Sequence, residues 1–267
     1  MPVDVTVLVC AHNEESHIRK SLEGILRQSL PPTRIILVAD RCTDNTVAVS
    51  KSMLPRNSIL IEKRKTLWEN SYAENLEIGR KNAIGEVLAI VDADILVPTS
   101  FLEKTSASCV EWASVSALVR TDPSQGLMNY LVSFWERGYL FTPLGREARG
   151  GARSISMRAL AEVAGFRDVM APDTDLDIRL KKHGEKVKMD TSLVALHLRK
   201  MGLARSVFYQ IKAGKARSQL GVSPLRTLLH SIMRLRPFVL YGYLKTQIDK
   251  DKSRRGVNHL GEGRLDQ

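Results

Sequence analysis

Three polar clusters in the sequence carry side chains that could bind a divalent cation or a phosphate group. They are Ala11-His12-Asn13-Glu14-Glu15, Asp40-Arg41-Cys42-Thr43-Asp44 and Asp92-Ala93-Asp94. Each follows a short apolar stretch that is typical of a β-strand. Carboxylate oxygens suit Mg²⁺ or Mn²⁺, which proteins commonly bind through one or two carboxylates together with substrate phosphates. For any single cluster, capping of the following helix by Asn13 or Asp44 explains the polar residues equally well.

The Asp92-Ala93-Asp94 cluster is the one that helix capping explains least well. It follows Val87–Val91, which is uniformly apolar and therefore predicts a central, buried strand. Alternation along an extended chain gives the two carboxylates different directions. Because this strand end faces two other polar strand ends, the pair predicts a metal site.

The elements that must position these clusters alternate between strand and helix. The predicted strands are 3–10, 34–39, 58–61 and 86–91, and the predicted helices are 14–28, 44–53 and 71–83. Such alternation predicts a parallel sheet with helices on both faces, whose ligands bind at the carboxyl ends of the strands. Beyond these elements the alternation loosens. The later expectations are helices at 101–109, 126–139 and 175–183, strands at 114–118, 155–157, 186–189 and 192–196, and a basic, glycine-containing loop at 145–151.

The ordered motifs resemble those of the family 2 glycosyltransferases, which have the GT-A fold. Val7–Glu15 is similar to the family's first strand and its P-x-x-N-E-E exit, and Val38–Thr46 is similar to its V-D-D-G-S-x-D-x-T turn. Ala83–Asp94 resembles A-x-G-E … D-A-D, and Asp173–Gly184 resembles E-D-x-D-L … R-L … G. The resemblance implies an α/β, Rossmann-like, doubly wound sheet that is mixed but mostly parallel, with the catalytic domain at 1–200 and a helical appendage after it.

The resemblance also implies roles for individual residues. The nucleotide-sugar donor, most simply a UDP- or GDP-sugar, would contact Ala11, Asn13, Glu14, Asp40, Asp92, Ala93, Arg153 and Arg199. Within that set, Asp40 takes the base, Asp92 holds the ribose or the metal, and Arg199 lies near the diphosphate. Asp92, Asp94 and His197 would bind Mn²⁺ or Mg²⁺. Two of these assignments have plain alternatives, since His197 could be a core side chain, and the loop residues Arg149 and Arg153 could simply be solvated.

Asp173 resembles the family's general base, which removes the proton of the acceptor hydroxyl and so implies inversion at the anomeric carbon. The chain departs from the family here, because Pro172 stands where glutamate is usual. The alternative for Asp173 is an N-cap of the following helix. A lipid phosphate acceptor is already an anion and would need no base.

Other departures narrow the expected reaction. The Gln-x-x-Arg-Trp motif of processive polysaccharide synthases does not occur in the sequence, so one sugar per encounter is expected. Arg41-Cys42 replaces the usual Gly-Ser, which leaves the nucleotide base open. A sugar-nucleotidyltransferase is the alternative enzyme, but it should carry a glycine-rich phosphate loop after the first strand.

The formal charge of +11 lies entirely in the last quarter of the chain. Residues 1–198 hold 25 basic and 25 acidic residues, whereas residues 199–267 hold 15 basic and 4 acidic. A neutral folded part argues against a nucleic-acid-binding module. The positive charge of the last quarter therefore indicates a binding partner other than nucleic acid. The helix predicted near residue 230 indicates which kind of partner it is.

That helix has an apolar stripe and a basic stripe. The apolar stripe is Leu225, Leu228, Leu229, Ile232 and Met233, and the polar one is Arg226, His230 and Arg234. An apolar face with basic flanks predicts that residues 201–248 bind an anionic membrane surface. We therefore expect an acceptor that is lipid-linked or a glycan close to the membrane. Packing against the catalytic domain or against a second subunit in a homodimer is the alternative. The polar residues 249–267 predict a disordered tail.

Localisation follows from the remaining features. The longest uncharged stretch, Pro123–Trp135, is too short to span a bilayer, and no secretory signal pattern follows Met1. We therefore expect a cytoplasmic protein that is peripheral on the membrane. Cys10, Cys42 and Cys109 are widely spaced and predict free thiols.

Overall fold

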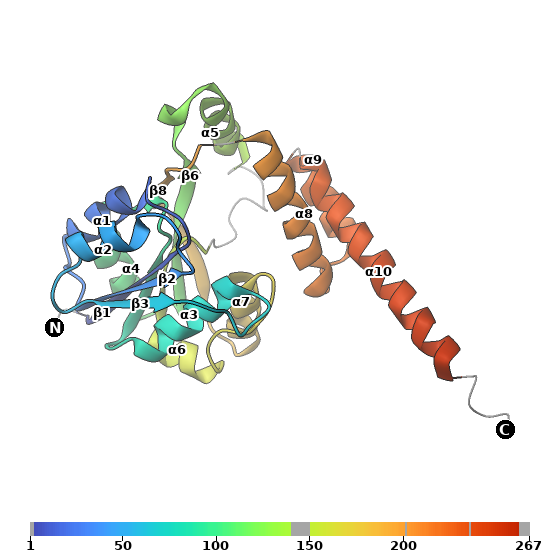
Figure 1. Cartoon of the computed structure of the whole chain (residues 1–267), viewed down its shortest axis with the longest axis horizontal. Coiled ribbons are helices and arrows are strands. Elements are labelled where there is room, and N and C mark those ends of the chain that lie inside the picture. The colour runs from blue at the N-terminus through green and yellow to red at the C-terminus, as the bar shows by residue number, and fades with distance from the viewer. Residues whose placement is uncertain (1–2, 140–149, 201, 235, 262–267) are drawn as a thin grey trace. The chain divides into compact units, whose positions relative to one another are not determined.

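The structure is a computed structural model that describes residues 3–139, 150–200, 202–234 and 236–261. The chain divides into two compact units, Met1–Lys200 and Met201–Gln267. The first unit holds the sheet and the second consists of helices (Figure 1).

The first four strands form the parallel half of an eight-stranded sheet within the described residues. They are β1 (Val5–Ala11), β2 (Arg34–Asp40), β3 (Ile59–Lys63) and β4 (Val87–Val91). The strand order across the sheet is β3-β2-β1-β4-β7-β6-β8-β5. Val7 pairs with Ile35 on one side and with Ala89 on the other. This register brings the polar clusters that follow β1, β2 and β4 to the same edge, as the sequence predicts.

The second half of the sheet is mixed. Strand β7 (Ala152–Ser156) runs antiparallel between β4 and β6 (Ser114–Thr121), and β8 (Val187–His197) runs parallel to β6. The two-residue strand β5 (Ile95–Leu96) pairs with the end of β8 so that Ile95 lies opposite His197. This pairing places His197 beside the Asp92-Ala93-Asp94 cluster.

Strand β8 joins the two predicted strands at 186–189 and 192–196. A bulge lies between Ala117 and Leu118 of β6, where the partner changes from Asp190 to Val194. Asp190 accepts hydrogen bonds from Ser192 at this point. The polar residues that separate the two predicted strands therefore lie at a bulge, and one continuous strand runs through it to His197.

Helices cover both faces of the sheet. The core on one face includes apolar side chains from α1 (Ile18–Leu26), α4 (Phe101–Ser108) and the edge of α2 (Thr46–Met53). The core on the other face includes side chains from α3 (Ser71–Asn82), α6 (Met157–Glu162) and α7 (Pro172–Lys182). The doubly wound α/β class predicted from the sequence is confirmed.

Helix α5 (Leu127–Tyr139) follows β6 and the short 3₁₀ turn η1 (Pro123–Gln125) and buries its polar side. Asn129 is buried and donates to the carbonyl oxygens of Asp122 and Arg199, at 3.1 Å and 3.2 Å. Leu131 and Phe134 are exposed. These two apolar side chains therefore do not pack into the core of this unit.

The second unit contains α8 (Leu203–Gln219), α9 (Pro224–Met233) and α10 (Pro237–Gly261). Helices α8 and α10 cross closely at Gly214 and Gly242, where any side chain would collide with the facing backbone. Helix α10 extends into the stretch 249–267 that the sequence predicts to be disordered, because its Lys, Arg and Asp residues do not break a helix. None of the helices in the described ranges is long and apolar enough to cross a membrane.

Candidate active site

The loops after β1 and β2 are fastened to each other by side chains of the predicted clusters. Asn13 Oδ1 accepts a hydrogen bond from the backbone N–H of Thr43 at 2.8 Å, and Asp44 accepts one from Glu15 at 3.0 Å. The cap position of α1 is His17, with no side-chain cap. Asn13 therefore does not cap α1 but shapes the edge of the site, with its backbone in the left-handed region at φ 54°. Ala11 is buried just before this loop.

Asp94 stands at the centre of a charged group. Its Oδ2 atom lies 3.1 Å from His197 Nε2 and 2.7 Å from Arg199 Nε, and Arg199 also pairs with Glu14. Burial opposes ionisation, but the hydrogen bonds and charges of His197 and Arg199 lower the pKa of Asp94 to about 2. Burial likewise opposes charge on His197, yet Asp94 raises its pKa. Four residues from three separate segments therefore meet as the sequence predicts.

Asp92 occupies a different environment from Asp94. Burial and the neighbouring charge of Asp94 raise the pKa of Asp92 to about 7, although Asp92 Oδ1 accepts a hydrogen bond from the Tyr72 hydroxyl at 2.9 Å. Tyr72 lies on α3, and the sequence around it shows only the spacing of a helix. The sequence therefore does not identify Tyr72 as a residue of the site. Ala93, between the two acids, is buried.

Asp173 and Asp92 lie on either side of a pair of glycines. A Cβ atom at Gly150 would lie 2.7 Å from Asp173 Oδ2, and one at Gly151 would lie 2.9 Å from Asp92 Oδ2. Any side chain at these two positions would crowd both carboxylates. Asp173 lies inside the first turn of α7, whose cap position is Ala171, so the N-cap alternative does not describe its position.

Arg153 is the buried arginine that the sequence predicts at the donor phosphates. Its side chain is 1% exposed, forms an ion pair with Asp177 and donates to Ser114 Oγ. Its Nη1 atom also lies 3.5 Å from the main-chain oxygen of Asp173. The guanidinium thus contacts Ser114 and the first turns of α7, and its contact with the donor phosphates stays a prediction. Arg149 lies outside the described residues.

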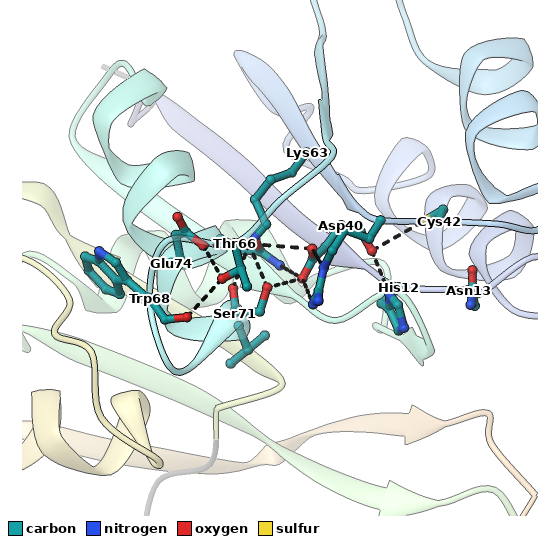
Figure 2. Close-up of polar contacts among 12 residues, drawn as sticks. His12, Asn13, Asp40, Cys42, Lys63, Thr66, Trp68, Ser71 and Glu74 are labelled. Carbon is teal, nitrogen blue, oxygen red and sulfur yellow. Dashed lines mark hydrogen bonds and ion pairs between the residues drawn. The ribbon is translucent and has the colours of Figure 1, made fainter.

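Asp40, at the end of β2, is surrounded by hydrogen-bond donors (Figure 2). Its carboxylate accepts from Ser71 Oγ, from Asn75 Nδ2 at 3.2 Å and from Arg41 Nε at 2.8 Å. Burial would raise the pKa of Asp40, but these hydrogen bonds and the charge of Lys63 lower it to about 2. Asp40 is therefore a fixed anion at the expected base-binding position.

Lys63 extends the Asp40 group toward α3. Its Nζ atom lies 3.6 Å from Asp40 Oδ1 and 3.0 Å from Glu74 Oε2, and Glu74 also accepts from Thr66 (Figure 2). The sequence indicates neither Lys63 nor Glu74, because a lysine at a strand end and a glutamate in a helix are ordinary surface residues.

Comparison with known families decides between the remaining alternatives. The model of glycosyl transferase family 2 matches residues 6–159, more than half of the chain. The chain belongs to this family. Membership in this family favours a glycosyltransferase over the sugar-nucleotidyltransferase and nucleic-acid-binding alternatives.

Two curated relatives match parts of this glycosyltransferase. An uncharacterized glycosyltransferase of Haemophilus influenzae is 31% identical over 104 residues, which are 38% of this chain and 31% of that protein. Glycosyltransferase GlyA of Streptococcus pneumoniae is 24% identical over 141 residues, which are 51% of this chain and 20% of that protein. The matched segments thus span less than a third of each relative.

Solved structures share the fold at low sequence identity. A mannosyltransferase from Pyrobaculum calidifontis, solved in complex with GDP-mannose and Mn²⁺, has a TM-score of 0.64 at 19% identity, covering 98% of this chain and 80% of that one. A mycobacterial protein has a TM-score of 0.61 at 16% identity, covering 83% and 76%. Staphylococcus aureus TarS 1-349 has a TM-score of 0.52 at 15% identity, covering 91% of each chain. These matches confirm the GT-A fold of this glycosyltransferase.

Asp94 and His197 are the residues of this glycosyltransferase that best fit a divalent cation. They place a carboxylate oxygen and an imidazole nitrogen side by side, a donor set that Mn²⁺ accepts. Within the described ranges, no three His, Cys, Asp or Glu side chains are grouped to hold a metal ion by themselves. The remaining ligands would have to come from donor phosphates, as is usual for ions of this type.

Proposed function

We propose that this glycosyltransferase moves one sugar from a nucleotide-diphosphate sugar, a UDP- or GDP-sugar, to a lipid-linked or glycan acceptor beside a membrane. The observation that carries the proposal is the meeting of Glu14, Asp94, His197 and Arg199 at one sheet edge. Buried acids held together by one histidine and one arginine suit a cation and a diphosphate. The complex of the P. calidifontis neighbour with GDP-mannose and Mn²⁺ supports this class of donor.

In the proposed donor complex, Asp94 and His197 hold Mn²⁺ or Mg²⁺. A bound divalent cation acts as a Lewis acid that neutralises the charge of the departing nucleoside diphosphate. Arg199, already aligned by Glu14 and Asp94, contacts the diphosphate from the same edge. Asp40 and the Asn13 loop border the nucleoside, and the buried Asp92, which accepts a hydrogen bond from Tyr72, holds the ribose or shares the metal.

Asp173 acts as the general base in this proposal. Its carboxylate takes the proton of the acceptor hydroxyl while the acceptor oxygen bonds to the anomeric carbon. The bond from that carbon to the diphosphate oxygen breaks at the same time, and its electron pair leaves with the nucleoside diphosphate. Attack from the face opposite the leaving group inverts the configuration. The position of Asp173 next to Gly150, with Arg153 behind its main chain, supports this role.

The experiment that tests the base role is Asp173→Asn, assayed with the native acceptor class. General-base catalysis contributes roughly 10²–10⁴-fold, so turnover with a hydroxyl acceptor should fall by that factor while donor affinity stays the same. Asp175→Asn is the matched control, because Asp175 lies in the same helical turn but pairs with Arg179. Unimpaired turnover of Asp173→Asn would contradict the base role and indicate an acceptor phosphate.

A further inference from the structure

Helix α9 buries the side that its sequence makes polar. Thr227, His230 and Ser231 are 0%, 7% and 5% exposed, whereas Leu225 and Ile232 are 66% and 62% exposed. The outer face of α9, as we call it, consists of Leu225, Leu228, Leu229, Ile232 and Met233, and all five are exposed. An amphipathic helix of a water-soluble domain normally has the opposite orientation.

Polar contacts within the second unit fix this orientation. Arg217 of α8 donates to Thr227 Oγ1 at 3.3 Å and lies 3.5 Å from the carbonyl oxygen of Arg226. Rolling the outer face inward would break the contacts of Arg217 with α9 and expose Thr227. The exposed apolar face is therefore a stable feature of the unit.

The charge around α9 is of one sign. Residues 201–248 contain eight basic residues and no acidic residue. Burial lowers the pKa of His230 to about 3, and the charges of Arg234, Arg217, Arg236 and Arg226 add to the effect. Two of these four arginines belong to α9 itself, Arg226 within the helix and Arg234 at its C-terminal cap.

We propose that the outer face of α9 docks on an anionic lipid membrane, with its aliphatic side chains among the acyl chains and the flanking arginines and lysines at the headgroups. An apolar face bordered by cations matches both layers of such a surface. A second copy of the chain is a poorer occupant, because a two-fold interface places the same patch on both partners and would bring like charges together. The inference gives a location to the proposed membrane-proximal acceptor and rests on the proposed function only for that purpose.

The test is co-sedimentation of the full chain with vesicles of phosphatidylcholine, with and without about 30% phosphatidylglycerol, at low salt. We expect binding to the anionic vesicles, weaker binding to the neutral ones, and release as salt rises well above physiological strength. Ile232→Asp should weaken binding by at least about tenfold, because it removes an inserted side chain and adds a charge of the wrong sign. Val110→Asp is the matched control, since it makes the same charge change at a residue 85% exposed in the first unit.

Circular dichroism and the melting temperature of each variant establish that it folds, and Leu225→Asp provides a second variant on the same face. The inference is overturned if the wild type does not bind anionic vesicles at low salt, or if Ile232→Asp and Val110→Asp bind them equally. It is also overturned if the outer face instead mediates a dimer that Ile232→Asp dissociates. Donor stabilisation and transfer to a water-soluble acceptor should be unchanged in Ile232→Asp. If the wild type shows neither donor stabilisation nor sugar transfer, that result contradicts the proposed function and leaves membrane docking unaffected.

Discussion

The two units of this glycosyltransferase use charge in opposite ways. The first unit, Met1–Lys200, has 27 basic and 25 acidic residues, and its acids converge at the ends of β1, β2 and β4. The second unit, Met201–Gln267, has 13 basic and 4 acidic residues, with no acid before Asp249. The first unit thus gathers acids at one edge of its sheet, whereas the second carries an excess of positive charge along its helices.

Helices α1 and α9 show the same contrast in packing. In α1 the apolar side chains Ile18, Leu22 and Ile25 are buried against the sheet, whereas in α9 the apolar stripe is outside and Thr227 and His230 are inside. An apolar stripe in the sequence therefore identifies a helix face that avoids water, but it does not show whether that face contacts the protein core, a membrane or a partner. If the two units divide chemistry and location between them, mutations should affect one property without the other.

The largest expected effect is on the chemistry of the first unit. Asp94→Asn should lower turnover on the order of 10³-fold, because loss of metal and diphosphate stabilisation costs several kcal/mol in the transition state. Binding to anionic vesicles should not change. Steady-state kinetics and co-sedimentation measure the two properties. Glu111→Gln, which alters an exposed acid of the same unit, is the control and should leave both intact.

Arg153→Met should destabilise the first unit by about 3–5 kcal/mol, because it leaves Asp177 without its partner in a buried position. The double variant Arg153→Met/Asp177→Leu should regain most of that stability, since apolar groups can replace a buried ion pair. Its kcat should stay low while KM for the donor changes little, because α7 no longer holds Asp173 in place. Urea unfolding and steady-state kinetics measure the effects. Full recovery of kcat together with stability would show that Arg153 has only a structural role.

Truncating one leucine in each helix sharpens the packing contrast. Leu22→Ala in α1 should lower the free energy of unfolding by about 2–5 kcal/mol, as for other buried leucines. Leu229→Ala in α9 should change it by no more than about 0.5 kcal/mol, because the side chain is exposed. Chemical denaturation of the two variants is the measurement. Equal losses would mean that the outer face of α9 is covered by protein in solution.

The smallest expected effect is a pH dependence of the second unit. Unfolded chain takes up a proton at histidine near pH 6.5, whereas folded His230 has a pKa of about 3. Stability should therefore fall as the pH drops below about 6.5, by roughly 1 kcal/mol between pH 7 and 5.5. His230→Gln should lose this part of the pH dependence, as measured by denaturation at each pH. An unchanged pH profile in the variant would contradict the buried, neutral state of His230.

Local patterns were sufficient to predict much of the first unit. The strands β1 to β4 follow from apolar runs, and the meeting of Asp94 with the loops after β1 and β2 follows from parallel strand order. The union of the predicted strands 186–189 and 192–196 into one strand could not be predicted, because Asp190 and Ser192 resemble a turn until their hydrogen bonds are known.

The roles of residues whose contacts lie far away in the sequence could not be predicted from local patterns. Arg153 lies in a basic, glycine-containing stretch that suggests phosphate binding, but its partner Asp177 is on α7, and only the fold brings the two together. Tyr72 reaches Asp92 from α3 in the same way. The orientation of α9 was equally hidden, since its spacing fits burial and exposure alike.

Metal-dependent binding of a nucleotide-sugar at the Asp94 site is tested most directly by the melting temperature of the full chain with UDP- and GDP-sugars, measured with and without Mn²⁺. A donor at about 100 times its dissociation constant adds roughly 2.7 kcal/mol of stability, which should raise the melting temperature on the order of 5 °C. If Asp94 holds the metal at the donor, at least one donor should give such a rise, the rise should be larger with Mn²⁺, and Mn²⁺ should have no effect in Asp94→Asn. Absence of stabilisation by any donor, or the same rise with and without Mn²⁺ in both proteins, would contradict metal-dependent binding at this site.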